Sequence, residues 1–135
     1  MKEAYVSYEI AKILKEKGFD EPCSSTYDTA VSGGTPIFYK YDVLHFFPNG
    51  MKNSDDKYGM VIYAPTHQMA CAWLRENHHI FIEISVSIDL NGNYHYRYYI
   101  LNKECKYVRK GYTDFDWNYE EAVEAAIKYC LENLI

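Results

Sequence analysis

The stretch that decides the fold is HIFIEISVSIDLNGNYHYRYYIL, residues 79–101. Apolar side chains occupy every second position on both sides of Gly92: Ile82, Ile84, Val86 and Ile88 before it, and Tyr94, Tyr96, Tyr98 and Ile100 after it. A period of two is typical of a strand with one apolar and one wet face. The stretch therefore predicts two strands joined by a turn around Gly92.

The length of the turn decides the pairing of the two strands. A two-residue Asn91-Gly92 loop would set even positions opposite odd ones and split the apolar set between two faces. A three-residue loop pairs Asp89 with Asn93 and keeps every apolar side chain on one face. Such loops favour a left-handed third residue, which suits Gly92. We therefore predict pairs 88–94, 86–96 and 84–98, with Glu83, Ser85, Ser87, His95 and Arg97 on the opposite face.

Three helices are predicted by apolar spacing and end signals. The first covers residues 8–17, with Ser7 as N-cap and with Gly18 and Phe19 in a Schellman ending. The second covers about 66–77. The last begins at Asn118, which can form a capping box with Glu121. Its apolar stripe contains Ala122, Val123, Ala126, Ile127, Cys130, Leu131 and Leu134. We expect this stripe to cover the apolar face of the hairpin.

The remaining segments give weaker patterns. Residues 20–36 hold turn formers without periodicity and are predicted as loop. Residues 37–47 are predicted as a strand that ends at Pro48, Asn49 and Gly50, with 58–64 as its hairpin partner. Residues 103–112 are predicted as an edge strand. The fold class is thus a single α+β domain, 1–135, with three helices and an antiparallel sheet of four to five strands, in the order α-β-β-α-β-β-(β)-α.

The composition excludes several classes of protein. Fourteen basic and 19 acidic residues give a net charge of −5, which provides no global attraction to nucleic acid or to anionic lipid. The four cysteines form no CxxC pair, and the chain begins without an apolar signal segment. No run approaches the roughly 18 apolar residues of a membrane span. We therefore expect a cytoplasmic protein with reduced thiols and no membrane partner.

Three segments resemble a known group of proteins: YEIAKILKEKGFDEPC (8–23), APTHQMACAWLREN (64–77) and YEEAVEAAIKYCLENLI (119–135). They are similar to segments of small uncharacterised proteins of gut Bacteroides-type bacteria and of their phages and mobile elements. The resemblance implies a bacterial or phage-infected cytoplasm. It implies no activity, cofactor or site residue.

Two cysteines raise questions of chemistry. Cys71 follows His67 by four positions, so both can lie on one side of a helix and hold a metal. The alternative is that His67 is solvated and Cys71 packs as a small apolar residue. Cys23 follows a proline in a predicted loop and is expected to be the exposed thiol. Its acidic neighbours, Asp20 and Glu21, oppose formation of a thiolate.

A basic segment with interleaved aromatic residues precedes the last helix. It contains Lys103, Lys106, Tyr107, Arg109 and Lys110. Such a segment can bind single-stranded nucleic acid by neutralising phosphates and stacking bases. A charged edge strand that resists aggregation explains the same residues. The sequence leaves both interpretations open.

The surplus of tyrosine is the last functional signal. Fifteen of the 23 aromatic residues are Tyr, a residue enriched at protein interfaces. No hydrolase, kinase or dinucleotide motif is present. We therefore expect a non-enzymatic protein-interaction module without a cofactor, which binds another protein or a second copy of itself. The alternatives are a nucleic-acid-associated protein and a metal-binding protein.

Overall fold

A computed structural model of the chain describes residues 3–28, 31–32, 35–36, 45–57, 59, 61–111 and 118–135. The chain divides into two units, Met1–Thr66 and His67–Ile135. Each unit has its own antiparallel three-stranded sheet, and three α-helices are described, so the α+β class is confirmed. The described strands do not join into the one sheet of four or five strands that the sequence analysis predicts.

The first unit opens with helix α1, Tyr8–Glu16, whose two ends form as predicted. The Ser7 side chain accepts from the Ile10 amide at 3.3 Å. At the other end the Gly18 amide donates to Lys15 and the Phe19 amide to Leu14, which is the hydrogen-bond pair of a Schellman motif. Gly18 has a backbone φ of +92°, which residues with a Cβ rarely adopt.

The sheet of the first unit has the order β4-β1-β5. Its strands are β1 (Cys23–Asp28), β4 (His45–Met51) and β5 (Val61–Tyr63). A short β2–β3 pair, Val31–Ser32 with Thr35–Pro36, and a 3-10 turn η1, Asn53–Asp55, complete the unit. Strand β5 pairs with β1 rather than with β4, so the predicted hairpin of 37–47 with 58–64 is wrong. Residues 37–44, 58 and 60 of that prediction lie outside the described residues.

Of the loop predicted for residues 20–36, residues 29, 30, 33 and 34 lie outside the described residues. The prediction is wrong for 23–28, 31–32 and 35–36, which form strands, and β1 is the central strand of this sheet. Its inward side chains are small or polar rather than aliphatic. Ser25 is buried and donates to the Ala64 carbonyl at 2.6 Å, and Tyr27 donates to the Val6 carbonyl at 2.7 Å. Side chains that satisfy their polar atoms inside a core give no apolar alternation in the sequence.

Strand β4 continues through Pro48, Asn49 and Gly50, which were predicted to end a strand. The pairing of β1 with β4 shifts register between Cys23 and Ser25, so an irregular stretch of β4 accommodates these residues. Strand β4 is at the edge of the sheet, where a proline without an N–H group is tolerated.

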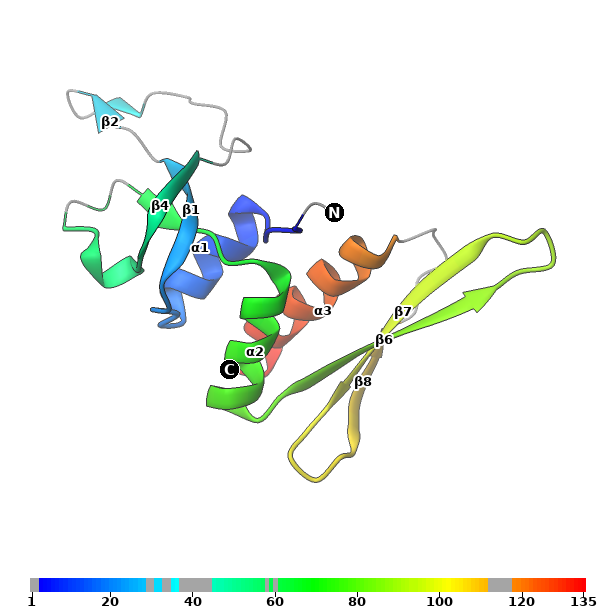
Figure 1. Cartoon of the computed structure of the whole chain (residues 1–135). Coiled ribbons are helices and arrows are strands. Elements are labelled where there is room, and N and C mark those ends of the chain that lie inside the picture. The colour runs from blue at the N-terminus through cyan, green and yellow to red at the C-terminus, as the bar shows by residue number, and fades with distance from the viewer. Residues whose placement is uncertain are drawn as a thin grey trace. The chain divides into compact units, whose positions relative to one another are not determined.

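The second unit is built around the predicted hairpin (Figure 1). It contains α2 (His67–His78), β6 (Phe81–Ile88), β7 (Tyr94–Leu101), β8 (Tyr107–Gly111) and α3 (Tyr119–Asn133). The sheet order is β6-β7-β8. The pairs 88–94, 86–96 and 84–98 are all present, so the three-residue loop is confirmed. Strand β8 forms within the predicted segment 103–112, of which Tyr112 lies outside the described residues.

Helix α3 begins with the predicted capping box. The Asn118 side chain accepts from the Glu121 amide at 2.8 Å, and the Glu121 carboxylate accepts from the Asn118 amide. The helix packs against β6, β7 and α2. The core residues of this unit include Tyr98, Ile100, Ala122, Val123, Ala126, Ile127, Cys130 and Leu131. None of the helices in the described residues has the length and apolar character needed to cross a membrane.

Candidate protein-interaction surface

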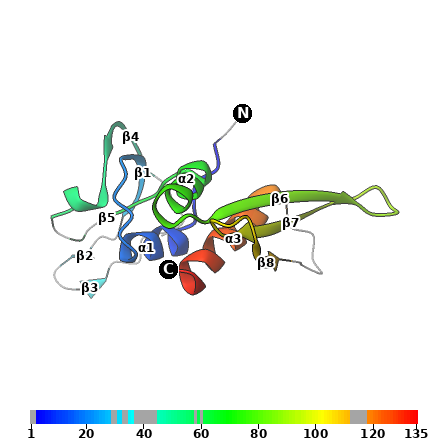
Figure 2. The ribbon, with the colours of Figure 1, turned by 90° about the horizontal axis from the view of Figure 1, so that it is seen from below.

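The far half of the hairpin carries apolar side chains that no part of the described chain covers. Val86 is 54% exposed, Ile88 62%, Tyr94 61% and Leu90, in the turn, 106%. In Figures 1 and 2 the β6–β7 ribbon runs out beyond α3 to a free turn. We name these four residues the hairpin surface. The sequence analysis places Val86, Ile88 and Tyr94 on the face covered by the last helix, and for these three that expectation is wrong.

The hairpin surface is continuous with the core of the second unit. Strand pairing puts Ile88 and Tyr94 on the same face as the buried Tyr98 and Ile100. Helix α3 covers only the near end of this face, where Tyr119 meets Tyr96 edge to face at 6.0 Å. One apolar face is therefore half inside the unit and half outside it.

A dense hydrogen-bond network around Asp89 holds the turn of the hairpin. One carboxylate oxygen of Asp89 accepts from the amides of Asn91 and Asn93 at 2.8 and 3.0 Å. The other oxygen lies 2.8 Å from His95 Nε2. The hydrogen bond with His95, followed by that from the Asn93 amide, lowers the pKa of Asp89 to about 2. The exposed surface is thus presented on an ordered turn, which reduces the entropy lost on binding.

This network predicts a pH dependence of the turn. A carboxylate with a lowered folded-state pKa stabilises the fold above its unfolded pKa of about 3.9, and the contribution is lost as pH falls through the folded value. We expect the Asn91 and Asn93 amides to lose protection between about pH 4 and pH 2. Amide exchange followed by NMR measures this. Asp89→Asn should show the weaker protection already at neutral pH, and equal protection in both proteins would contradict the assignment.

The predicted basic segment lies on β8 and on the turn before it, and all five of its residues are exposed. The Tyr107 and Tyr99 rings are in contact at a tilt of 59°, with 5.4 Å between their centroids, and Lys110 Nζ lies 5.4 Å from the Tyr107 centroid. Arg109 is instead paired with Ile100 and lies 4.7 Å from the ring of Tyr129 on α3. The structure therefore brings Tyr107 and Lys110 together and places Arg109 on the other face of the sheet.

A register shift explains this division. Lys110 is opposite Tyr99, but Tyr107 is opposite Leu101, so the pairing slips by one residue between Ile100 and Leu101. The slip turns Tyr107 to the face of Lys110. The remaining basic residues, Lys103 and Lys106, belong to the turn, where Lys103 Nζ lies 3.9 Å from Glu104.

The turn between β7 and β8 repeats the hydrogen bonds of the hairpin turn. The Asn102 side chain accepts from the Glu104 and Lys106 amides at 3.0 and 3.1 Å, and its carbonyl accepts from Cys105. Cys105 has φ +59 at the position that Gly92 occupies, with φ +81, in the hairpin turn. A residue with a Cβ is strained in this conformation.

Replacing this cysteine by glycine is expected to stabilise the second unit. For Cys105→Gly we predict a gain of roughly 0.5–1 kcal/mol in the free energy of unfolding, because the left-handed strain exceeds the entropy cost of glycine. Cys105→Ala, which removes the thiol and keeps the Cβ, should leave stability unchanged. Urea unfolding of both variants measures the difference. A destabilised Cys105→Gly protein would show that the side chain itself contributes.

The predicted metal site at His67 and Cys71 has no third ligand among the described residues. His67 is buried, and its Nε2 lies 2.9 Å from a Glu124 carboxylate oxygen across the α2–α3 contact. Burial raises the pKa of the Cys71 thiol to about 11, which disfavours the thiolate that a metal requires. Over the described residues, no three His, Cys, Asp or Glu side chains are arranged to hold a metal ion. The pairing with Glu124 explains His67 as a structural residue.

Cys23 was expected to be the exposed thiol, and this is wrong. It is 2% exposed on β1, and burial, followed by the charge of Glu21, raises its pKa to about 12. The exposed thiol is Cys105, while Cys71 is half-buried and Cys130 buried. The sequence could not show this, because the central strand that buries Cys23 was predicted as loop.

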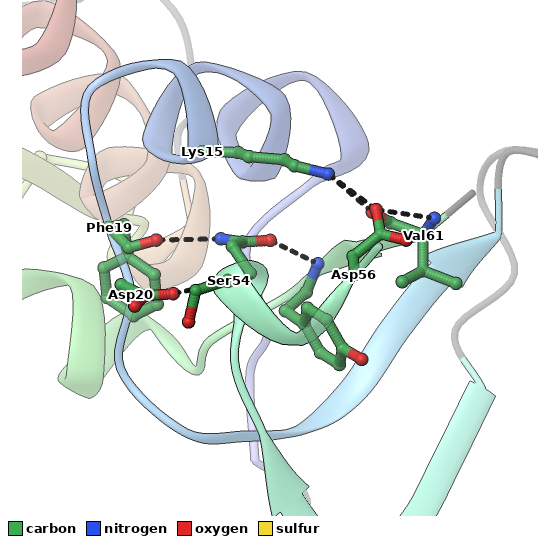
Figure 3. Close-up of polar contacts among 8 residues, drawn as sticks. Lys15, Phe19, Asp20, Ser54, Asp56 and Val61 are labelled. Carbon is green, nitrogen blue, oxygen red and sulfur yellow. Dashed lines mark hydrogen bonds and ion pairs between the residues drawn. The ribbon is translucent and has the colours of Figure 1, made fainter. Parts of the chain in front are cut away.

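A polar cluster in the first unit is structural (Figure 3). Lys15 Nζ lies 2.9 Å from the Asp56 carboxylate and donates to the Val61 carbonyl at 3.0 Å. Asn53 donates to the Phe19 carbonyl at 2.8 Å and accepts from the Tyr63 amide. These contacts fasten the segment around η1 to the end of α1 and to β5. Each of these polar groups is used within the fold.

Among the features described above, the hairpin surface is thus the candidate binding site. Its residues could be found in the sequence as an apolar alternation, but the alternation does not show how far the covering helix reaches. This assignment depends on geometry, because no family model, no curated protein and no solved structure matches the chain.

Proposed function

We propose that the chain is a non-enzymatic protein-interaction module that binds a protein through the hairpin surface. The observation that supports this proposal is the exposure of Val86, Ile88, Leu90 and Tyr94 together on one ordered ribbon. Burial of a large apolar side chain is worth about 1.5–3 kcal/mol. Exposed apolar patches on small proteins mark contact sites more often than chance. By the resemblance in the sequence, the setting is a bacterial cytoplasm, including that of a phage-infected or mobile-element-bearing cell.

The chemistry of the surface favours a protein as the partner. Its four side chains are aliphatic or tyrosine, the kinds that fill the centre of a protein interface. A nucleic acid would require cations on this face to neutralise its phosphates. The basic residue Arg97 on β7 has a strand position that places it on the opposite face.

Photo-crosslinking from the turn tests the proposal. A benzophenone amino acid at Leu90 should capture one protein reproducibly in a Bacteroides-type extract, or a second copy of the chain in the purified protein. The same group at Glu132, which is exposed on α3, is the matched control. Ile88→Ser should abolish the adduct without loss of helical signal, because the Ile88 side chain contributes little to the core. Equal adducts from positions 90 and 132 would refute the proposal.

A second candidate function is weak binding of single-stranded nucleic acid on the other face of the sheet. The observation that favours it is the Tyr99–Tyr107 ring pair with Lys110 beside it, since stacked aromatic residues and cations bind bases and phosphates. Fluorescence anisotropy with a labelled oligonucleotide tests it. Binding should weaken steeply with salt and be lost in Tyr107→Ala. No change in anisotropy at low salt would remove this candidate.

A further inference from the structure

The two edges of the β6-β7-β8 sheet differ in how they are protected. Strand β8, at one edge, presents Arg109 and Lys110, and charged side chains keep edges from pairing with other chains. Strand β6, at the other edge, has the sequence FIEISVSI with Glu83 as its one charge and neither proline, glycine nor lysine. Within the described residues β7 is its one sheet neighbour. An eight-residue strand of this kind is a template for a further strand.

The backbone groups at this edge can be assigned from the hairpin turn. The Asp89 amide donates to the Asn93 carbonyl, so 89–93 is a hydrogen-bonded pair. Hydrogen-bonded and non-hydrogen-bonded pairs alternate along an antiparallel ladder. The N–H and C=O groups of the even residues therefore point away from β7. These residues are Ile82, Ile84, Val86 and Ile88.

We propose that two copies of this chain pair antiparallel through β6, with the two-fold axis at Ser85. This inference rests on the proposed function, because it names a second copy as the partner that lies along the β6 side of the ribbon, beside Val86 and Ile88. Leu90 and Tyr94 stay exposed on the joined apolar face. In this register Ile84 is opposite Val86 of the second copy, and Ile82 is opposite its Ile88. Four hydrogen-bonded pairs give about eight backbone hydrogen bonds between the copies. The result is a six-stranded sheet with one continuous apolar face.

The charges and the covered regions of the strand favour this register. Glu83 is opposite Ser87 of the second copy, so no like charges meet. A shift of the axis to Val86 would set Glu83 opposite Asp89, and a shift to Glu83 would set it opposite itself; both are repulsive. The chosen register also lays the exposed end of each ribbon beside the near end of the other. There Ile88 of one copy lies opposite Ile82 of the second copy, next to the part of the face that α3 of the second copy covers.

Site-specific disulfides test the register. Ser85 faces itself across the axis in a non-hydrogen-bonded pair, where Cα atoms stand about 4.5 Å apart, within the range of a disulfide. Ser87 of the two copies would be separated by about 13 Å. In a Cys105→Ser background, Ser85→Cys should form a covalent dimer under mild oxidation, and Ser87→Cys should not. A covalent dimer of Ser87→Cys, or none of Ser85→Cys, would overturn the register.

Sedimentation of the purified protein tests the dimer itself. We expect a dimer whose Kd rises roughly fivefold in Ser85→Glu, since two carboxylates then meet across the axis. Within one chain the new carboxylate is opposite Arg97, so folding is preserved. A wild-type protein that is monomeric at all concentrations overturns the inference. If the crosslinker at position 90 still captures a different protein, and Ile88→Ser abolishes that adduct, the proposed function stands without the dimer. If the crosslinker captures no protein, both the proposed function and the dimer are refuted.

Discussion

Gly111→Ala is expected to destabilise the second unit by about 3 kcal/mol or more, because among the described glycines Gly111 has the least room for a Cβ. A Cβ at Gly111 would overlap the Cε1 and Cζ carbons of the Tyr98 ring. Tyr98 is buried opposite Gly111 in the sheet and its hydroxyl accepts a hydrogen bond from Arg109, which raises the pKa of Arg109. The ring cannot move aside without leaving the core. Overpacking of this kind costs about 1–3 kcal/mol, and expelling a buried aromatic ring costs about 3–5.

A double-mutant cycle distinguishes this steric cause from a general intolerance of β8. In a Tyr98→Ala background the ring is absent, so Gly111→Ala should cost almost nothing. Urea unfolding with an unchanged m value measures each step. If the cost of Gly111→Ala is the same with and without the Tyr98 ring, the predicted overlap is not its cause.

Asn53→Ala should destabilise the first unit by about 2–3 kcal/mol. The Asn53 side chain makes hydrogen bonds with two backbone groups, the Phe19 carbonyl and the Tyr63 amide. Each net hydrogen bond contributes about 1 kcal/mol, and a backbone group left without a partner adds to the loss. The turn η1 would then be held by the Lys15–Asp56 and Asp20–Ser54 contacts. We expect faster exchange of the Tyr63 amide, measured by NMR.

Ser54→Ala is the matched control for Asn53→Ala. Ser54 donates to the Asp20 carboxylate through its backbone amide at 2.7 Å and, at this exposed site, through its side chain as well; both hydrogen bonds lower the pKa of that carboxyl, and the larger effect is that of the amide. Alanine keeps this amide, so the stability of the unit should stay within about 0.5 kcal/mol of the parent protein. A loss in Ser54→Ala as large as that in Asn53→Ala would mean that the segment tolerates no substitution.

Local signals explain why the helices and the hairpin could be predicted from the sequence. The ends of α1 and α3 depend on side chains a few positions away, such as Ser7 and the Asn118–Glu121 box. The register of β6 and β7 follows from apolar positions on both sides of Gly92, which admit one loop length. In each case the information lies within about 20 residues of chain.

The first sheet could not be predicted because its pairings are not local. Strand β1 pairs with β4 and β5, whose partner residues lie about 20 to 40 positions further along the chain. Its buried members include Cys23 and Ser25, which do not mark a strand by apolarity. The strand becomes recognisable only when the Ala64 carbonyl is present to accept from Ser25.

The candidate site illustrates a different limit. The alternation that predicts an apolar face is the same at Ile82 as at Ile88, yet α3 covers the face only near one end. Val86, Ile88 and Tyr94 were therefore identified correctly as members of an apolar face and wrongly as core. A sequence pattern predicts the face of the sheet on which a side chain lies. Whether that side chain is buried depends on where a helix distant in the sequence ends.

The cysteine in the β7–β8 turn has a practical consequence for spectroscopy. Cys105 is the exposed thiol of the four, so a nitroxide reagent should label it in preference to the others. The β7 strand separates it from the Gly92 turn by roughly 27 Å. In an antiparallel pair of copies the two spin labels would lie at opposite ends of the joined sheets. Electron–electron dipolar spectroscopy on the otherwise unmodified chain could then read their separation directly.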